Sequence, residues 1–342
     1  MTTTATPEVG RRQQKLTDKP LLEVKDLKVY FPKRKGGWLF GERAWLRAVD
    51  GVSFTIREGE TFGLVGESGC GKTTTARAVI QLQKPTSGEI WLGGEQIDHL
   101  TPRQMLPHRR HVQMIFQDPF ASLNPRMTVG RIIQEPMEIF GLYGSNRKLE
   151  AMRLMDLVGL NPRFLNRYPH EFSGGQRQRI GIARALAVQP KLIVCDEPVS
   201  ALDVSIQAQV INLLMDLQRQ LGLAYLFISH DLSVVRHISH RIGVMYLGRI
   251  VELATADALH ANPRHPYTQA LLSAAPIPDP VLQRQRQRII LKGEVPSADR
   301  VYSGCPFVDR CPIAEQFCRE KIPLLEGRRH LVACHKAPPE VE

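Results

Sequence analysis

The chain contains a glycine-rich segment whose residue types are those that bind phosphate. Residues 66–73 read Gly-Glu-Ser-Gly-Cys-Gly-Lys-Thr, which fits the pattern G-x-x-x-x-G-K-[ST]. A predicted strand over 61–65 and a predicted helix over 73–82 flank the segment, as this motif requires. Backbone N–H groups of such a loop bind phosphate oxygens, while Lys72 reaches the terminal phosphates and the Thr73 hydroxyl binds Mg²⁺. Residues 66–73, hereafter the P-loop, therefore predict a site for a nucleoside triphosphate with Mg²⁺.

The predicted nucleotide contacts cover the whole P-loop and the residue after it. They are Gly66, Glu67, Ser68, Gly69, Cys70, Gly71, Lys72, Thr73 and Thr74. Cys70 has no second cysteine near it in the sequence, and we interpret it as a small space-filling residue and not as a reactive thiol.

Two apolar runs end in polar residues that suit phosphate chemistry. Residues 191–197 end in Asp196 and Glu197, and such a run is typical of a strand buried on both faces of a parallel sheet. Asp196 is predicted to bind Mg²⁺, and Glu197 is predicted to polarise the attacking water. Residues 226–231 form the second run, which places His230 at the same carboxyl edge of the sheet, near the γ-phosphate.

Three further short motifs complete a series that resembles the ATP-binding cassette (ABC) superfamily. They are Phe116-Gln117-Asp118-Pro119, Ser173-Gly174-Gly175-Gln176 and Ser200-Ala201-Leu202-Asp203. The resemblance implies that Gln117 senses Mg²⁺ and links to a membrane partner, that Asp203 ends the D-loop, and that His230 is the switch histidine. It also implies that Phe31 stacks on adenine, with Tyr30 as the alternative. One departure is Phe172, which stands where the family usually has Leu and keeps an apolar contact.

The segment Ser173–Gln176 changes the expected mechanism, because in this superfamily it faces the P-loop of another subunit. The resemblance implies that Ser173 and the amides of Gly174 and Gly175 contact the γ-phosphate of the partner's ATP and stabilise charge in the transition state. No single chain then holds a complete site. ATP is expected to join two cassettes, which hydrolysis releases.

The pattern of elements predicts an α/β fold with a RecA-like parallel core, an antiparallel β part before it and an inserted helical lobe. We expect a disordered tail over residues 1–20, a cassette over 21–262 with the helical lobe at about 118–188, and an extension over 263–342. A Gly- and Trp-bearing insert over 35–45 is predicted to be a loop. The proline-rich composition after residue 262 marks the boundary before the extension, which carries several cysteines.

Composition limits the kinds of partner. No stretch approaches 18 consecutive apolar residues, and the first twenty residues lack the apolar block of a secretory signal. We therefore expect a cytosolic chain that a partner holds at the membrane. The formal net charge of +11 suits anionic lipid or phosphate, whereas the chain has few aromatic residues and no recognised nucleic-acid motif. Nucleic acid is not an expected partner.

Four of the six cysteines lie in the extension, at Cys305, Cys311, Cys318 and Cys334. Disulfides are disfavoured in a reducing cytosol. Structural zinc usually has tighter cysteine pairs, although His330 and His335 could substitute as ligands. The wider gaps and the two Cys-Pro pairs favour an iron–sulfur cluster. The spacing alone leaves three interpretations open, namely a cluster, a zinc site or no metal site.

Residues 122–126, 264–272 and 304–307 resemble the ATPases of oligopeptide/dipeptide importers, and the resemblance runs over nearly the whole chain. It implies an ATPase that powers import of di- or oligopeptides across the cytoplasmic (inner) membrane from its cytoplasmic side. It implies as partners a second cassette, with a heterodimer expected, two transmembrane permease subunits and a substrate-binding protein. It also favours a [4Fe-4S] cluster on the four cysteines. The alternatives are an importer for nickel, glutathione or another small solute, and a soluble ABC ATPase without a transport role.

Overall fold

The structure is a computed structural model of the chain, and it describes residues 19–35, 42–274, 289–291, 293 and 296–340. The predicted tail over residues 1–20 lies outside this part, apart from its last two residues.

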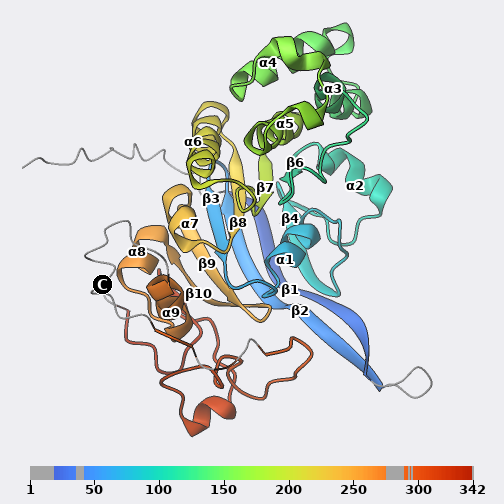
Figure 1. Cartoon of the computed structure of the whole chain (residues 1–342). Coiled ribbons are helices and arrows are strands. Elements are labelled where there is room, and N and C mark those ends of the chain that lie inside the picture. The colour runs from blue at the N-terminus through green and yellow to red at the C-terminus, as the bar shows by residue number, and fades with distance from the viewer. Residues whose placement is uncertain (1–18, 36–41, 275–288, 292, 294–295, 341–342) are drawn as a thin grey trace, which may run out of the picture.

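Two β-sheets form the centre of the molecule (Figure 1). The larger sheet has the strand order β11-β10-β9-β3-β8-β7-β6, and the smaller one has the order β2-β1-β4-β5. Strands β6, β7, β8, β3 and β9 run parallel, while β10 and β11 are antiparallel to their neighbours. The bounds of the larger sheet's strands are β3 Thr61–Val65, β6 Val112–Ile115, β7 Leu192–Asp196, β8 Ala224–Ser229, β9 Arg241–Tyr246, β10 Arg249–Thr255 and β11 Leu331–Val332.

The two faces of the larger sheet belong to two different hydrophobic cores, because successive side chains of a strand point to opposite faces. Leu64, Val194 and Leu226 pack toward the smaller sheet, whereas Ile193 and Phe227 pack toward the helices. Burying each such side chain stabilises the fold by about 1.5–3 kcal/mol. The fully apolar strands predicted from the sequence are therefore covered on both faces.

The smaller, antiparallel sheet extends further than the sequence indicated. Its strands are β1 Pro20–Lys35, β2 Glu42–Arg57, β4 Ser87–Leu92 and β5 Glu95–Gln96. The prediction of a loop over residues 35–45 is wrong at both ends, because β1 and β2 pair antiparallel as far as Lys35 and Glu42. Residues 36–41, which hold the glycines of the insert, lie outside the described residues.

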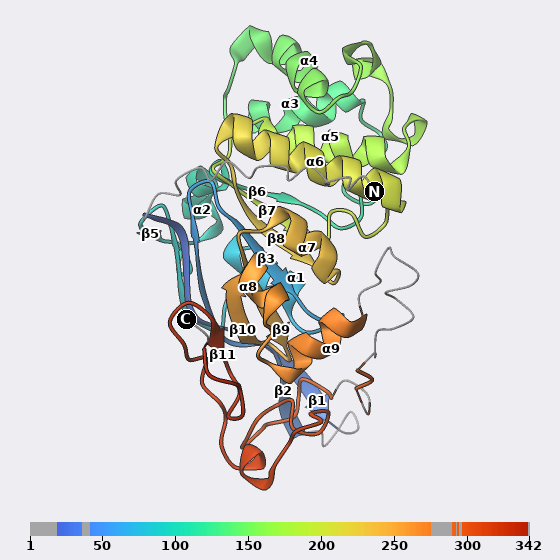
Figure 2. The ribbon, with the colours of Figure 1, turned by 90° about the vertical axis from the view of Figure 1, so that its left-hand side faces the viewer.

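Three helices form a lobe at one end of the molecule (Figure 2). They are α3 Val129–Ile139, α4 Arg147–Leu157 and α5 Gly174–Leu186. The other helices are α1 Lys72–Val79, α2 Pro102–Arg109, α6 Val204–Leu221, α7 Leu232–Ile238, α8 Ala256–Ala261 and α9 Pro266–Ala274. Both sheets and the lobe follow the predicted order along the chain.

The C-terminal residues lie at the end of the molecule opposite the lobe and contain little regular structure (Figure 1). Strand β11 pairs with β10 at the edge of the larger sheet. The Glu252 carboxylate of β10 is fully buried and accepts hydrogen bonds from the backbone N–H groups of Arg264 and His265, at 2.7 and 3.0 Å. His330 Nε2 lies 2.6 Å from the same carboxylate. These contacts fix the extension to the sheet.

Candidate functional site

Parallel strands bring the predicted site residues to one edge of the larger sheet. Strands β3, β8, β7 and β6 are consecutive neighbours, and their registers pair Val65 with Ser229, Asp196 with Ile228, and Ile115 with Cys195. The strands therefore end almost level with one another. The P-loop, His230, Glu197 and Gln117 follow these four strand ends, which is where open α/β sheets bind ligands.

The P-loop turns sharply between β3 and α1. Gly71 has a φ of +109°, a conformation that side-chain-bearing residues rarely adopt. A Cβ atom at Gly71 would lie 2.1 Å from the Ala48 carbonyl oxygen, so the close approach of the two backbones requires glycine. Cys70 is buried, and burial raises the pKa of its thiol, which fits the interpretation of Cys70 as a space-filling residue.

Lys72 is the first residue of α1, and its side chain is only 4% exposed. The ammonium donates hydrogen bonds to the carbonyl oxygens of Gly66 and Glu67, at 2.8 and 3.1 Å. It also lies 3.8 Å from Glu197 Oε1. The ammonium group is thus folded back over its own loop and faces the carboxylate of Glu197, the residue that follows β7.

Thr73 and Asp196, both predicted to bind Mg²⁺, lie in contact with each other. The Thr73 hydroxyl donates a 2.9 Å hydrogen bond to Asp196 Oδ1. Burial raises the pKa of the Asp196 carboxyl, and the Glu197 charge adds to this effect. Mg²⁺ prefers oxygen ligands, and the Thr73 hydroxyl and the buried Asp196 carboxylate supply them. Among the described residues, Asp196 has no cationic hydrogen-bond partner. These side chains, with the Gln117 amide nearby, therefore fit the metal that the sequence implied.

Glu197 lies at the centre of the polar contacts of the site. Its Oε2 accepts a 3.2 Å hydrogen bond from Gln117 Nε2 and lies 3.2 Å from His230 Nδ1. Its backbone φ of +46° lies in the left-handed region, which is uncommon for a residue with a side chain and often marks a functional position. The Glu197 side chain is 13% exposed and that of His230 is 58% exposed. A carboxylate that is held this way and open on one side can accept a proton from a bound water.

The segment Ser173–Gln176 lies apart from this site within the described part of the chain. Ser173 is the N-cap of α5, and its backbone and side chain form a reciprocal capping box with Gln176. Both residues are exposed, and among the described residues neither has a hydrogen bond to the P-loop. Asp203, which precedes α6, is exposed as well and makes no side-chain capping bond.

The two aromatic residues proposed for adenine stacking differ in their surroundings. The Tyr30 hydroxyl is hydrogen-bonded to Asp50, whose other oxygen accepts a 2.6 Å bond from Arg249, and the Arg47 guanidinium lies 5.6 Å from the Tyr30 ring. Phe31 is half-buried beside the smaller sheet's core. Because Tyr30 is already engaged, Phe31 stays the predicted stacking residue.

Two residues that the sequence did not single out also contact the P-loop. The Tyr267 hydroxyl accepts a 2.9 Å hydrogen bond from the backbone N–H of Glu67, and Arg310 makes an ion pair with the Glu67 carboxylate. Tyr267 and Arg310 are separated from Glu67 by 200 and 243 residues, so no local sequence pattern could have indicated these contacts.

Comparisons with known proteins cover most of the chain. The family "ABC transporter" matches residues 49–200, and the family "Oligopeptide/dipeptide transporter, C-terminal region" matches residues 251–318. The oligopeptide transport ATP-binding protein OppF of Escherichia coli is 56% identical over 326 residues, which are 94% of this chain and 97% of that protein. AppF of Bacillus subtilis, with the same description, is 55% identical over 320 residues, 92% of this chain and 97% of that protein.

The chain belongs to the ABC transporter ATP-binding proteins. Among solved structures, a dimeric ATP-binding cassette in a post-hydrolysis state with ADP and Pi matches this ABC ATPase with a TM-score of 0.61 and 29% identity. The match covers 69% of this chain and 98% of that one. The predicted α/β cassette fold and the assignment of the chain as an ATPase are thereby confirmed.

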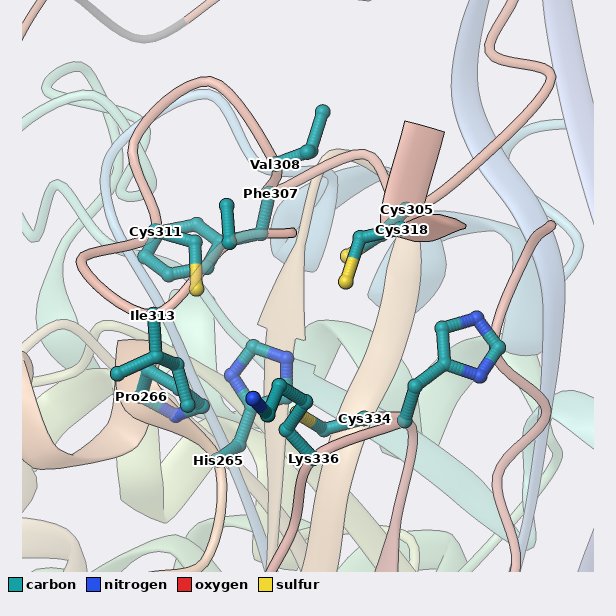
Figure 3. Close-up of a pocket in the computed structure, with 12 residues that line it drawn as sticks. His265, Pro266, Cys305, Phe307, Val308, Cys311, Ile313, Cys318, Cys334 and Lys336 are labelled. Atoms are coloured by element: carbon teal, nitrogen blue, oxygen red, sulfur yellow. The ribbon is translucent and has the colours of Figure 1, made fainter. Parts of the chain in front are cut away.

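The predicted iron–sulfur cluster is wrong, and so is the zinc alternative. Figure 3 shows Cys305, Cys311, Cys318 and Cys334 spread around a pocket that His265 also lines. The described residues include all four, yet they contain no group of three or more His, Cys, Asp or Glu that could hold a metal ion. The matched families and relatives are described as ATP-binding transport proteins, with no cluster in their descriptions.

The surroundings of the cysteines and of the two candidate histidines argue against a metal site. Burial raises the pKa of the Cys305 thiol to about 11 and also raises the pKa values of Cys311 and Cys334, which favours neutral thiols over the thiolates that bind metals. His330 Nε2 is taken by Glu252, and His335 Nε2 is 2.9 Å from the Lys321 carbonyl oxygen. All four cysteines line the same pocket.

Proposed function

We propose that this ATPase hydrolyses ATP to drive the import of di- or oligopeptides across the cytoplasmic membrane. The observation that carries the proposal is the similarity to OppF over nearly the full length of both chains, including the extension. A cassette alone would be shared with ABC proteins of many functions, whereas the C-terminal region matches a family described for oligopeptide/dipeptide transporters.

The proposed roles follow from the arrangement of the site. Lys72 and the P-loop amides bind the β- and γ-phosphates, and Phe31 stacks on adenine. Thr73, Asp196 and Gln117 hold Mg²⁺, which neutralises phosphate charge when bound. Glu197 accepts the proton of the attacking water, while His230 keeps the Glu197 carboxylate in place through the 3.2 Å contact.

The proposed assembly contains two cassettes. Ser173, Gly174 and Gly175 of each chain bind the γ-phosphate of the ATP held by the other, with Gln176 supporting Ser173 and Asp203 lying at the contact between the cassettes. The exposure of Ser173, Gln176 and Asp203 supports this arrangement, as does the similarity to a dimeric cassette. We propose that the second cassette is a different chain, which makes the pair a heterodimer.

We further propose that the pair docks on two separate permease subunits at the cytoplasmic side of the inner membrane, with a substrate-binding protein delivering the peptide. Among the residues that the structure describes, no helix is long and apolar enough to cross a bilayer. The proposed division of the chain is a cassette over 21–262, with the lobe at about 118–188, and an extension over 263–342.

Uptake of a labelled peptide into membrane vesicles tests the function. The vesicles would contain this chain, its permeases, the second cassette and the binding protein. We expect ATP-dependent accumulation of tri- to pentapeptides that stops when Lys72→Ala replaces the wild-type chain. ATP-dependent uptake of nickel or glutathione in place of peptide would contradict the proposed substrate.

A further inference from the structure

The extension reaches the nucleotide site at one P-loop residue, Glu67. Arg310 Nη1 donates a 2.7 Å hydrogen bond to Glu67 Oε2, and Arg310 Nη2 donates a 3.0 Å bond to Oε1. The Arg310 side chain is 8% exposed and that of Glu67 is 27% exposed. Two parallel N–H···O bonds between a planar guanidinium and a carboxylate fix both groups in distance and in orientation.

The backbone of Glu67 connects the same contact to the phosphate-binding lysine. Its N–H donates to the Tyr267 hydroxyl at 2.9 Å, and its carbonyl oxygen accepts a 3.1 Å bond from Lys72 Nζ. Tyr267 and Arg310 thus hold the backbone N–H and the carboxylate of Glu67, while Lys72 binds its carbonyl oxygen. A shift of Glu67 would move a group that determines where the Lys72 ammonium lies.

Arg310 itself has little freedom to move. Its guanidinium lies 5.9 Å from the ring of Tyr246, and its backbone N–H donates a 3.0 Å hydrogen bond to the Phe307 carbonyl. The Phe307 ring packs against Tyr246 and Tyr267 with centroid distances of 5.2 and 5.5 Å. This aromatic group connects β9, α9 and the extension, so Arg310 meets the P-loop from a rigid support.

We propose that Arg310 is a positioning residue for ATP, and that through it the extension sets the affinity of the nucleotide site. With Glu67 fixed, the start of the P-loop and Lys72 are already ordered before the phosphates arrive, so binding costs less conformational entropy. The coupling is reciprocal, because phosphates that order the P-loop also favour docking of the extension on it. The inference rests on the assignment of the P-loop as the ATP site.

The variant Arg310→Ala in the full-length chain tests this role. We expect the Kd for ATP with Mg²⁺, measured with the purified chain, to rise about tenfold. In the assembled transporter we expect a similar rise in KM with kcat within about twofold, because the lost interaction affects binding and not the chemical step. Arg310→Lys keeps the charge but loses the bidentate geometry. Its Kd for ATP should therefore lie between those of the wild type and of Arg310→Ala.

Arg319→Ala is the matched control, since Arg319 belongs to the same extension but pairs with Asp309, away from the P-loop, at 51% exposure. We expect it to leave the Kd unchanged. The double variant with Glu67→Gln and Arg310→Ala should raise the Kd by less than the product of the two single-variant factors. Such a result identifies Glu67 and Arg310 as a coupled pair.

A Kd for Arg310→Ala within about twofold of wild type, in a variant that unfolds at the wild-type temperature, would overturn the proposal. If Arg310→Ala does not fold, Glu67→Gln takes its place, and the same tenfold rise is expected. Loss of folding in both variants would show a purely structural pair and would also overturn it. Failure of the wild-type chain to bind ATP would instead refute the proposed function.

Discussion

Glu197 accepts contacts from two different loops, and this limits where its carboxylate can point. Gln117 holds Oε2 from the loop after β6, and His230 approaches the same oxygen from the loop after β8. Lys72 lies 3.8 Å from Oε1, on the side where the phosphates are proposed to bind. A general base needs a fixed orientation toward its water as well as a suitable charge, and these contacts supply the orientation.

We predict that Glu197→Gln still binds ATP but hydrolyses it about 10²- to 10⁴-fold more slowly. The amide keeps the size and the hydrogen-bonding reach of the carboxylate but cannot accept the proton. Phosphate release measures the rate, and Glu58→Gln, an exposed change in the turn after β2, is the control. Turnover close to that of the wild type would exclude Glu197 as the base.

Residues that follow strand ends could be predicted from the sequence, because apolar runs and glycine signals are local. Thr73 contacts Asp196, and Glu197 contacts His230, at the sheet edge where the sequence had placed these residues. The contact of Arg310 with Glu67 could not be predicted, because the two residues are 243 positions apart in the sequence and only folding brings them together. The cysteine spacing misled for a related reason: a spacing does not specify which way the side chains point or whether they ionise.

Among the elements, the first helix was predicted closely and the first hairpin was not. The helix predicted over residues 73–82 is α1, which begins one residue earlier at Lys72 and ends at Val79. The ends of β1 and β2 are polar and aromatic, and their pairing with each other, not their composition, makes them strands.

The backbone N–H of His265 donates a 3.0 Å hydrogen bond to Glu252 of β10, which joins the start of α9 to the larger sheet. The Nδ1 atom of the His265 ring accepts a 3.1 Å bond from the Tyr267 backbone N–H. A ring that accepts at Nδ1 must be neutral there. Burial lowers the pKa of His265 from 6.5 to about 4, despite the opposing charge of Glu252.

We predict that the chain loses stability as the pH falls from about 6.5 toward 4. In this window the unfolded chain binds a proton at His265 that the folded chain excludes, so the stability is complete above pH 6.5 and declines below it. The loss at pH 4 is about 3 kcal/mol. Urea unfolding at several pH values measures it. His265→Asn should flatten the dependence, whereas the exposed control His335→Asn should not; equal slopes in all three proteins would contradict the prediction.

At the scale of the whole molecule, the lobe and the extension lie at opposite ends of the sheets (Figure 2). The lobe contains α5, whose N-cap is Ser173. The extension contacts the P-loop through the ion pair of Arg310 with Glu67. None of the hydrogen bonds of Ser173 reaches the P-loop in the described part of the chain. In the proposed pair, the residues that bind a chain's own ATP and those that contact the partner's ATP are therefore different and can be changed separately by mutation.

We predict that Ser173→Asp leaves ATP binding by the single chain unchanged but prevents ATP-dependent pairing. Aspartate remains a good N-cap for α5, so the helix stays intact, while its charge repels the γ-phosphate held by the partner. Turnover in the assembled transporter should fall about 10²-fold. Size-exclusion chromatography with ATP in a Glu197→Gln background measures the pairing. Asn161→Asp, a similar change at another cap in the lobe, is the control; normal pairing by Ser173→Asp would show that the two halves of the site do not meet across subunits.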